Sequence, residues 1–197
     1  QYIIHRDAIT KLKTWVDEFE SGKTKLLCAI IYGPPGSGKT TLAYNLFRNK
    51  KYDIIEFQPD HNKTHKQDMI KLEEMVNGNN ILMMINNKKK AILFDDIEIG
   101  SSGERGFCTD IINLLEKYKK KKKFFKNPLI LTISEKTCNK KTKIIDKYTQ
   151  VVHLNRILPH ELFKIGKKIV DDDNIIIDDI NLRLISNDCQ GDIRSLR

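Results

Sequence analysis

The stretch Leu26–Thr41, LLCAIIYGPPGSGKTT, decides the fold of this chain. Its first half, residues 26–32, is a continuous apolar run, which is typical of a strand buried on both faces of a parallel sheet. Its second half matches the pattern GxxxxGK[ST] and leads into a segment with helical spacing. Glycines let backbone N–H groups converge on phosphate oxygens, and the N-terminus of the following helix favours an anion. The order strand, loop and helix therefore predicts a nucleoside triphosphate site.

The side chains of this loop have distinct predicted roles. We expect Lys39 to reach the β- and γ-phosphates and the Thr40 hydroxyl to ligate Mg²⁺. The predicted ATP-binding residues of the loop are Gly33, Pro34, Pro35, Gly36, Ser37, Gly38, Lys39, Thr40 and Thr41. In a random chain of this length and composition the pattern would occur with a probability of roughly 0.6%. A fortuitous glycine-rich turn is therefore a poor explanation of the match.

A second half of the site is predicted at the end of another strand. Residues 91–96, AILFDD, form an apolar run that ends in two carboxylates. We expect this strand to neighbour the one before the loop, with Asp95 holding Mg²⁺ through water. Asp96 would orient or deprotonate the attacking water. An acidic turn after a core strand is common in isolation, but its pairing with the loop favours a catalytic nucleotide site.

Apolar periodicity predicts alternating helices and strands up to residue 155. Helices are expected at residues 7–19, 39–50, 66–76 and 111–119, and strands at 26–32, 53–57, 91–94, 128–133 and 151–154. Helical segments alone follow, one opened by Pro159, one near 180–185, and a third opened by Gly191-Asp192 that the last residue cuts short. We therefore predict an α/β P-loop NTPase base at 1–155, a parallel sheet flanked by helices, and a small all-helical lid at 156–197.

Composition narrows the class of protein. The 197 residues carry 35 Lys+Arg and 26 Asp+Glu, a formal charge of +9, and 40% are hydrophobic, enough for a core. Lys, Ile and Asn share AT-rich codons, so the charge supports nucleic-acid binding only weakly. The lysine run at 119–123 is interpreted as a solvated, mobile insertion.

The sequence also contains no run of 18 apolar residues, the length that would suggest a membrane span. Widely spaced cysteines without a CxxC pair indicate reduced intracellular thiols and no zinc site.

Several motifs together resemble AAA+ ATPases of the clamp-loader clade. These are GPPGSGKTT at 33–41, FDDIE at 94–98, LTISE at 131–135 and GDIR at 191–194. Within the clade, the segment DDIEIGSSGERG at 95–106 is similar to the large subunit of replication factor C. The resemblance implies that Ser134 occupies the sensor-1 position and that Arg194 occupies the sensor-2 position, both near the γ-phosphate. The N-terminal segment IIHRDAITKLKTWV resembles the clade's helix beside the adenine pocket, which implies that Ile4 contacts the nucleotide.

Two departures from the clade's pattern bear on hydrolysis. Asp96 stands where the family usually has Glu, so its carboxylate is about one methylene further from the water, and hydrolysis is expected to be slow. Residues 135–150 contain no Ser-Arg-Cys arginine finger. We therefore expect a lone chain to be a poor ATPase.

The resemblance also implies partners, with weaker support from the residues. Clamp docking by Ile81, Met84 and Ile85 is weighed evenly against an ordinary buried helix end or short strand. Contacts with DNA phosphates are implied for two helix starts, by Lys63, Thr64, Lys66, Ser102 and Arg105. The implied partners are a sliding clamp, clamp-loader small subunits and primer-template DNA.

The sequence thus predicts an ATP- and Mg²⁺-dependent clamp-loader module for DNA replication or repair. It would act inside the cell, in a nucleus or at the cytoplasmic replication site of a virus. The alternatives are a checkpoint-type or scaffold subunit with weak or no hydrolysis, or another AAA+ replication ATPase.

Overall fold

A computed structural model of the chain describes residues 4–57, 65–78, 88–95, 97, 105–134 and 146–196. Side chains are described throughout these ranges except at 65 and 105–108. The helices are α1 (Arg6–Glu20), α2 (Lys39–Asn49), α3 (His65–Val76), α5 (Arg105–Lys120), α7 (Pro159–Asp172) and α8 (Asp179–Asp188), with a 3₁₀ turn η1 (Ile193–Leu196). The strands are β1 (Cys28–Tyr32), β2 (Asp53–Phe57), β3 (Lys90–Phe94), β4 (Leu129–Ile133) and β5 (Thr149–His153).

The strands form one parallel sheet in the order β2-β3-β4-β1-β5. All residues of β1, β3 and β4 are buried, as the continuous apolar runs predict for strands covered on both faces. The predicted α/β class is therefore confirmed. One detail of the prediction is wrong: β3 does not neighbour β1, because β4 lies between them.

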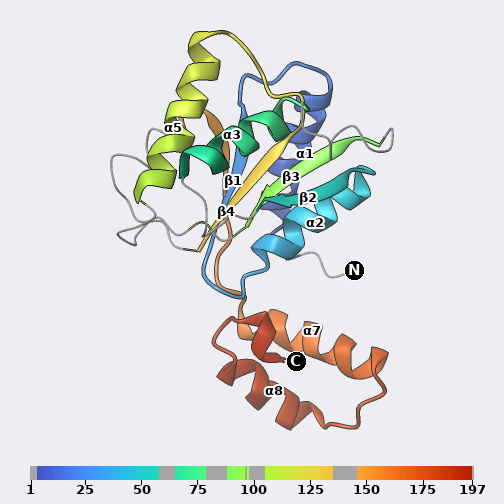
Figure 1. Cartoon of the computed structure of the whole chain (residues 1–197). Coiled ribbons are helices and arrows are strands. Elements are labelled where there is room, and N and C mark those ends of the chain that lie inside the picture. The colour runs from blue at the N-terminus through green and yellow to red at the C-terminus, as the bar shows by residue number, and fades with distance from the viewer. Residues whose placement is uncertain are drawn as a thin grey trace.

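Alternating side chains of the strands form two cores. Ala29 and Ile31 of β1 face a cluster with α1 and α2, which includes Leu12 and Phe47. Ile30, between them, belongs to the cluster on the opposite face, with residues of α3 and α5. The base is therefore a three-layer sandwich with α1 and α2 on one face of the sheet and α3 and α5 on the other (Figure 1).

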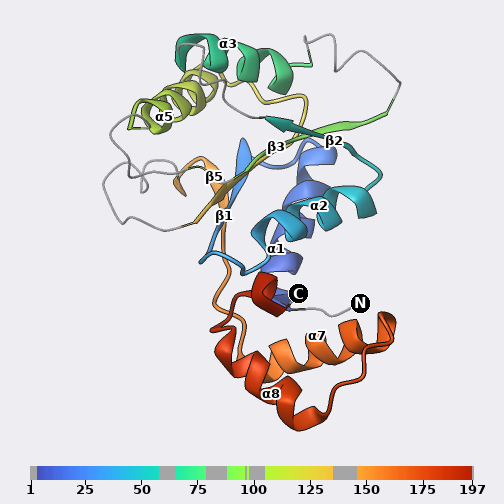
Figure 2. The same cartoon turned by 60° about the horizontal axis from the view of Figure 1, so that its bottom comes forward.

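Beyond β5, α7, α8 and η1 form a separate helical unit below the sheet in Figures 1 and 2. Its own small core contains Leu162, Ile165 and Cys189, and Ile193 and Leu196 of η1 pack against it. The boundary predicted at 155/156 lies in the connection between β5 and α7. The third helix expected after Gly191 is a short 3₁₀ turn.

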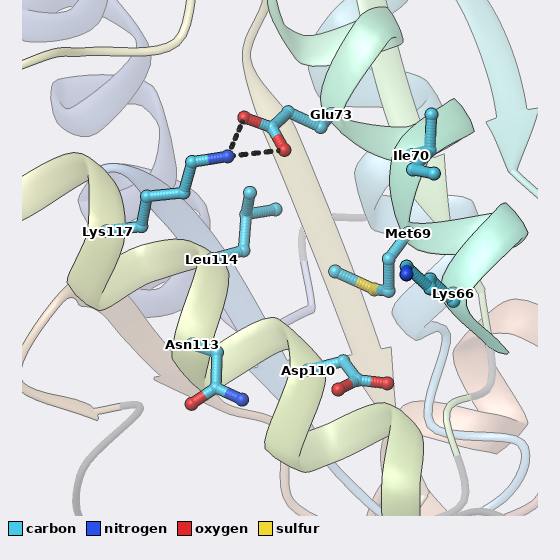
Figure 3. A pocket seen from close by; sticks show the side chains of 8 residues that line it. All are labelled: Lys66, Met69, Ile70, Glu73, Asp110, Asn113, Leu114 and Lys117. Carbon is cyan, nitrogen blue, oxygen red and sulfur yellow. Dashed lines mark hydrogen bonds and ion pairs between the residues drawn. The ribbon is translucent and has the colours of Figure 1, made fainter.

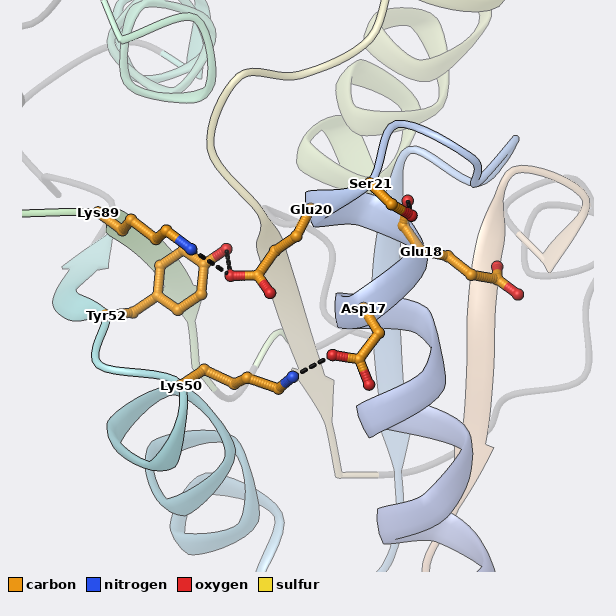
Figure 4. A network of polar contacts seen from close by, with 7 residues as sticks. All are labelled: Asp17, Glu18, Glu20, Ser21, Lys50, Tyr52 and Lys89. Carbon is orange, nitrogen blue, oxygen red and sulfur yellow. Dashed lines mark hydrogen bonds and ion pairs between the residues drawn. The ribbon is translucent and has the colours of Figure 1, made fainter.

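Ion pairs tie α1 to the ends of two other elements (Figure 4). Lys50, just after α2, pairs with Asp17. Lys89, just before β3, donates to Glu20 Oε1 at 2.8 Å, and the Tyr52 hydroxyl donates to the same oxygen at 3.0 Å. The bond from Lys89, with that from Tyr52, holds the pKa of Glu20 below its ordinary 4.5, although burial acts to raise it.

We predict that this network weakens in acid. Because the folded pKa of Glu20 lies below its unfolded value, the ionised carboxylate stabilises the fold above pH 4.5, and this contribution is lost as the pH falls through the folded pKa. The difference in unfolding free energy between wild type and Glu20→Gln should therefore be largest above pH 4.5 and shrink towards zero as the pH falls through the lowered folded pKa of Glu20. Urea titrations across this fall in pH measure it. Glu18→Gln, on the same helix, is the control and should show no such trend; an equal trend would contradict the prediction.

Candidate nucleotide-binding site

The loop between β1 and α2 has the backbone that its glycines allow. Gly36 and Gly38 adopt positive φ angles of 70° and 90°, which side chains with a Cβ rarely take. Gly38 is the N-cap of α2 and offers no side-chain acceptor, and the first turn of α2 contains no acidic residue. The N-terminus of α2 therefore has neither a side-chain cap nor an acidic residue in its first turn, as expected for a phosphate site at a helix N-terminus.

Lys39 is buried and folds back over the loop. Its Nζ donates to the carbonyl oxygens of Gly33 at 3.0 Å and Pro34 at 3.1 Å. An ammonium group held by two neutral carbonyls exchanges them for charged phosphate oxygens at a gain, because hydrogen bonds between charged partners are about twice as strong. The lysine is thus positioned at the mouth of the loop, ready to bind a phosphate.

The carboxylate of Asp95 joins the loop to the sheet. The Thr40 hydroxyl lies 2.9 Å from both Asp95 carboxylate oxygens, and the Thr132 hydroxyl donates to Asp95 Oδ1 at 2.6 Å. Oxygen donors of this kind, a hydroxyl and a carboxylate, are the ligands that Mg²⁺ prefers. Thr40 and Asp95 therefore fit the predicted metal site.

Thr132 is a residue that the sequence analysis missed. It belongs to β4, the strand inserted between β1 and β3, and it is fully buried. Its neighbour two residues on, Ser134, was assigned the sensor role, but it is not among the residues that line the described cavity. The usable signal was a lone polar residue inside the apolar run LILTI. Such a buried hydroxyl needs a hydrogen-bond partner, and here Asp95 is that partner.

The helical unit completes a cavity of about 280 Å³ over the loop. Its lining residues are Gly36, Gly38, Lys39, Thr40, Thr41, Asp95, Ile193 and Arg194. Arg194 comes from η1, more than 150 positions beyond the loop, and lines the same cavity as Lys39 and Thr40; its sensor-2 role stays a prediction. The Ile193 N–H donates to the Gly36 carbonyl at 3.2 Å, which fastens η1 to the loop.

The Asp192 side chain lies so close to Gly36 that position 36 of the loop must be glycine. A Cβ at position 36 would lie 1.9 Å from Asp192 Oδ1, so any larger residue would push the two apart. The same carboxylate oxygen accepts the Arg194 backbone N–H at 2.8 Å. The Asp192 side chain, just before η1, therefore both orders the turn that carries Arg194 and rests against the phosphate loop.

The N-terminal segment reaches the same junction. Ile4 packs against the apolar cluster of the helical unit. His5, at the start of α1, has a left-handed backbone with φ 60°. Burial lowers the pKa of His5, opposed by the Glu161 carboxylate and by a hydrogen bond with the Ser37 backbone. This places residues 4 and 5 near the loop and the helical unit; Ile4 is not among the residues that line the cavity described above, and its contact with the nucleotide stays a prediction.

Helix α2 is anchored to the edge of the sheet one turn after Thr40. The Tyr44 hydroxyl contacts the Glu56 carboxylate of β2, and Arg48 lies 5.3 Å from the centre of the Tyr44 ring. The bond to Glu56 raises the pKa of Tyr44 to about 12. The Tyr44 hydroxyl therefore stays protonated near neutral pH and can donate to Glu56. This contact holds α2, the helix that presents Thr40, against β2.

Comparisons with known proteins agree with this geometry. Residues 19–169, about three quarters of the chain, match the family described as Novel STAND NTPase 3. The chain belongs to this family of NTPases. The matched segment contains the loop, Asp95, Thr132 and the start of the helical unit.

Replication factor C large subunits are similar to this NTPase chain. Those of Sulfurisphaera tokodaii and Sulfolobus acidocaldarius are each 28% identical to it, over 95% and 98% of this chain. The large subunit of Methanococcus maripaludis is 28% identical over 97%. The chain spans about 40% of the length of these relatives. These matches support the resemblance to the AAA+ clamp-loader clade.

Solved structures of RuvB from Thermotoga maritima share the fold. The Holliday junction branch migration motor superposes with a TM-score of 0.66 at 15% identity, over 98% of this chain and 59% of the RuvB chain. A RuvB mutant superposes with a TM-score of 0.70 at 16% identity, over 99% and 60%. The base with its helical unit is thus an AAA+ fold.

Other predicted site residues lie apart from the cavity or outside the described residues. Asp96, Lys63, Thr64, Ser102, Ile81, Met84 and Ile85 lie outside the described residues, as does the Arg105 side chain. Lys66 lines a groove of about 380 Å³ between α3 and α5 (Figure 3), together with Asp110 and the ion pair Lys117–Glu73.

In the described part of the chain, no group of three His, Cys, Asp or Glu residues could hold a metal, and no helix is long and apolar enough to cross a membrane.

We predict that Gly36→Ala undocks η1 and weakens nucleotide binding at least about tenfold, because the new Cβ overlaps the Asp192 carboxylate. Fluorescent ATP titration measures the affinity. Gly22→Ala is the matched control: its φ of 67° is equally unfavourable for alanine, but no atom lies within 4 Å of the added Cβ. Equal affinity losses in both variants would show that backbone strain, not contact with Asp192, is responsible.

Proposed function

We propose that this NTPase module binds Mg·ATP and hydrolyses it slowly as the AAA+ module of a clamp-loader large subunit. The observation that carries the proposal is that three separate parts of the chain contribute to one cavity, with Lys39, Thr40, Asp95 and Arg194 in its lining. Lys39 and the α2 N-terminus would hold the phosphates, Thr40 and Asp95 would hold Mg²⁺, and Arg194 would contact the γ-phosphate.

Nucleotide binding would control the angle between base and lid. Arg194 and the Ile193–Gly36 hydrogen bond belong to the same turn, so a ligand that attracts Arg194 also favours the docked position of η1. Ser134 would monitor the γ-phosphate or water as part of the same response. Release of the γ-phosphate would remove the charge that holds Arg194 and would allow the lid to move.

Clamp loading is the role favoured by the similarity to replication factor C large subunits. The module would cooperate with small subunits to place a sliding clamp on primer-template DNA, at a site of replication inside the cell, nuclear or viral. Lys63, Thr64, Lys66, Ser102 and Arg105 would contact DNA, and Ile81, Met84 and Ile85 would dock on the clamp. Because the chain spans about 40% of those relatives, each partner is part of this proposal.

A scaffold or checkpoint-type subunit with little hydrolysis is the second candidate. The observation that favours it is Asp96 in place of the family's Glu. Such a protein would use ATP binding alone to set its shape. ATPase assays with and without DNA, clamp and small subunits separate the two candidates, since only a loader is expected to be stimulated.

We predict that Lys39→Ala abolishes the heat of Mg·ATP binding in calorimetry, because no other cation replaces the ammonium within the loop. Lys50→Ala is the control, since Lys50 lies just beyond the C-terminal end of the helix that Lys39 begins, where it pairs with Asp17 of α1. It should bind Mg·ATP with wild-type heat. Undiminished binding by Lys39→Ala would contradict the proposed site.

We predict that Asp96→Glu raises the rate of ATP turnover by about tenfold or more, because the longer side chain brings the carboxylate closer to the attacking water. Asp96→Asn should abolish turnover while ATP binding is retained. Single-turnover assays with radiolabelled ATP resolve the slow rates. A turnover rate unchanged by both substitutions would exclude Asp96 as the base.

A further inference from the structure

Nine of the chain's 28 lysines lie at the end of the sheet opposite the nucleotide site. In a parallel sheet, all strands begin at the same end of the sheet, so the segments that lead into them all lie at that end. Figure 1 shows the connections before β1 and β4 at the end of the base away from the helical unit. These connections contain Lys23, Lys25 and the run from Lys119 to Lys126, and Lys147 precedes β5.

Three adjacent strands bring these lysines together. β4, β1 and β5 are neighbours in the sheet, so their starts lie within about 10 Å of one another. Two contacts join the connections directly: Lys119 Nζ donates to the Lys25 carbonyl at 3.2 Å, and the Leu27 N–H donates to the Tyr148 carbonyl at 2.9 Å. We call the resulting surface the lysine edge. Its members are Lys23, Lys25, Lys119, Lys120, Lys121, Lys122, Lys123, Lys126 and Lys147, all exposed.

The backbone of the lysine edge is held in place. α5 extends to Lys120, and the turn after it is closed by backbone hydrogen bonds, such as Lys123 N–H to Tyr118 O at 3.0 Å. Phe125 is buried against Tyr118, and the Lys126 N–H donates to Val76 O at 2.8 Å. The run at 119–123 is therefore the end of a helix and its turn, not the insertion expected from the sequence.

The charge of the lysine edge is not compensated locally. Residues 21–32, 117–134 and 147–160 contain no Asp or Glu. Four carboxylates border the surface, Glu18, Glu20, Glu116 and Asp146; Glu20 pairs with Lys89, and Asp146 accepts a hydrogen bond from the Tyr32 hydroxyl at 3.3 Å. Within the described ranges, no carboxylate pairs with any of the nine lysines. Lys119 and Lys120 interact favourably with the C-terminal dipole of α5, which explains why lysine occurs at these two positions. The dipole does not explain the lysines of the other two connections.

An exposed aromatic side chain stands among these lysines. Phe124 is 49% exposed, whereas its neighbour Phe125 is 4% exposed. The buried ring holds the turn and the exposed ring is presented to solvent between Lys123 and Lys126. Aromatic rings on a basic surface are the stacking platforms on which proteins bind single-stranded nucleic acid.

We propose that the lysine edge, with Phe124, binds single-stranded nucleic acid through its phosphates and bases, as a second site separate from the helix starts at the nucleotide end of the sheet. Lysine is depleted at protein–protein interfaces, which disfavours an acidic protein as the partner. Lysines spread over three connections instead suit a flexible chain of phosphates, and the ring adds stacking that is independent of sequence.

The test measures binding of the whole chain to a fluorescent oligothymidylate by anisotropy across a salt series. Lys120→Glu/Lys121→Glu/Lys123→Glu should weaken binding at least about tenfold at low salt. It should also flatten the slope of log affinity against log salt by about 2, as expected for three lost phosphate contacts. Lys11→Glu/Lys13→Glu/Lys164→Glu is the matched control: it reverses the same number of exposed charges on α1 and α7, away from the lysine edge, and should bind within about twofold of wild type.

Each outcome decides the proposal. Equal weakening by both triple variants would show that net charge, not the lysine edge, attracts the oligonucleotide, and would overturn it. Phe124→Ala should weaken binding of the single strand about fivefold or more and that of a duplex of equal length much less; equal effects would overturn the stacking role. Binding of the lysine-edge variant that drops for phosphatidylserine vesicles but not for the oligonucleotide would also overturn the proposal. Unchanged Mg·ATP binding in all variants establishes that the fold and the nucleotide site are intact.

Discussion

The contact between Thr40 and Asp95 is the constraint on which the site depends. It joins the start of α2 to the end of β3, although a third strand separates β3 from the strand before the loop. Both oxygens of the carboxylate are used, and Thr132 of the intervening strand holds one of them. Asp95 directly follows β3, Thr132 lies within β4, and Thr40 is in the first turn of α2, which packs on the sheet. Their positions are therefore determined by the packing of the base.

The second constraint couples this rigid base to the helical unit. The phosphate loop is a ligand-binding element on one side and a docking surface for η1 on the other, through the Gly36 carbonyl and the space left by its missing Cβ. Asp192 fills that space and orders the turn of Arg194. The Gly36–Ile193 hydrogen bond and the Asp192 side chain are thus direct contacts between the loop and the helical unit, and the proposed control by nucleotide would act through them.

The two ends of the parallel sheet carry different kinds of functional side chain. The carboxyl ends of β1 and β3 carry the loop and the acidic residue, while the amino ends of β4, β1 and β5 carry the lysine edge. Codon composition explains an excess of lysine but not its concentration over three adjacent strand starts, which the sequence order hides because β4 and β1 are about 100 residues apart.

The elements and the phosphate loop follow from local patterns in the amino-acid sequence. Buried strands have unbroken apolar runs and the phosphate loop has a strict spacing, so residues 26–41 and 91–95 could be interpreted locally. The resemblance to clamp loaders pointed to Arg194 because GDIR is a contiguous motif. Only the tertiary structure decided that β4 lies between β1 and β3, that Thr132 bonds to Asp95, and that Asp192 rests on Gly36. Strand order and contacts between distant residues depend on how layers pack, and no local periodicity records which strands become neighbours.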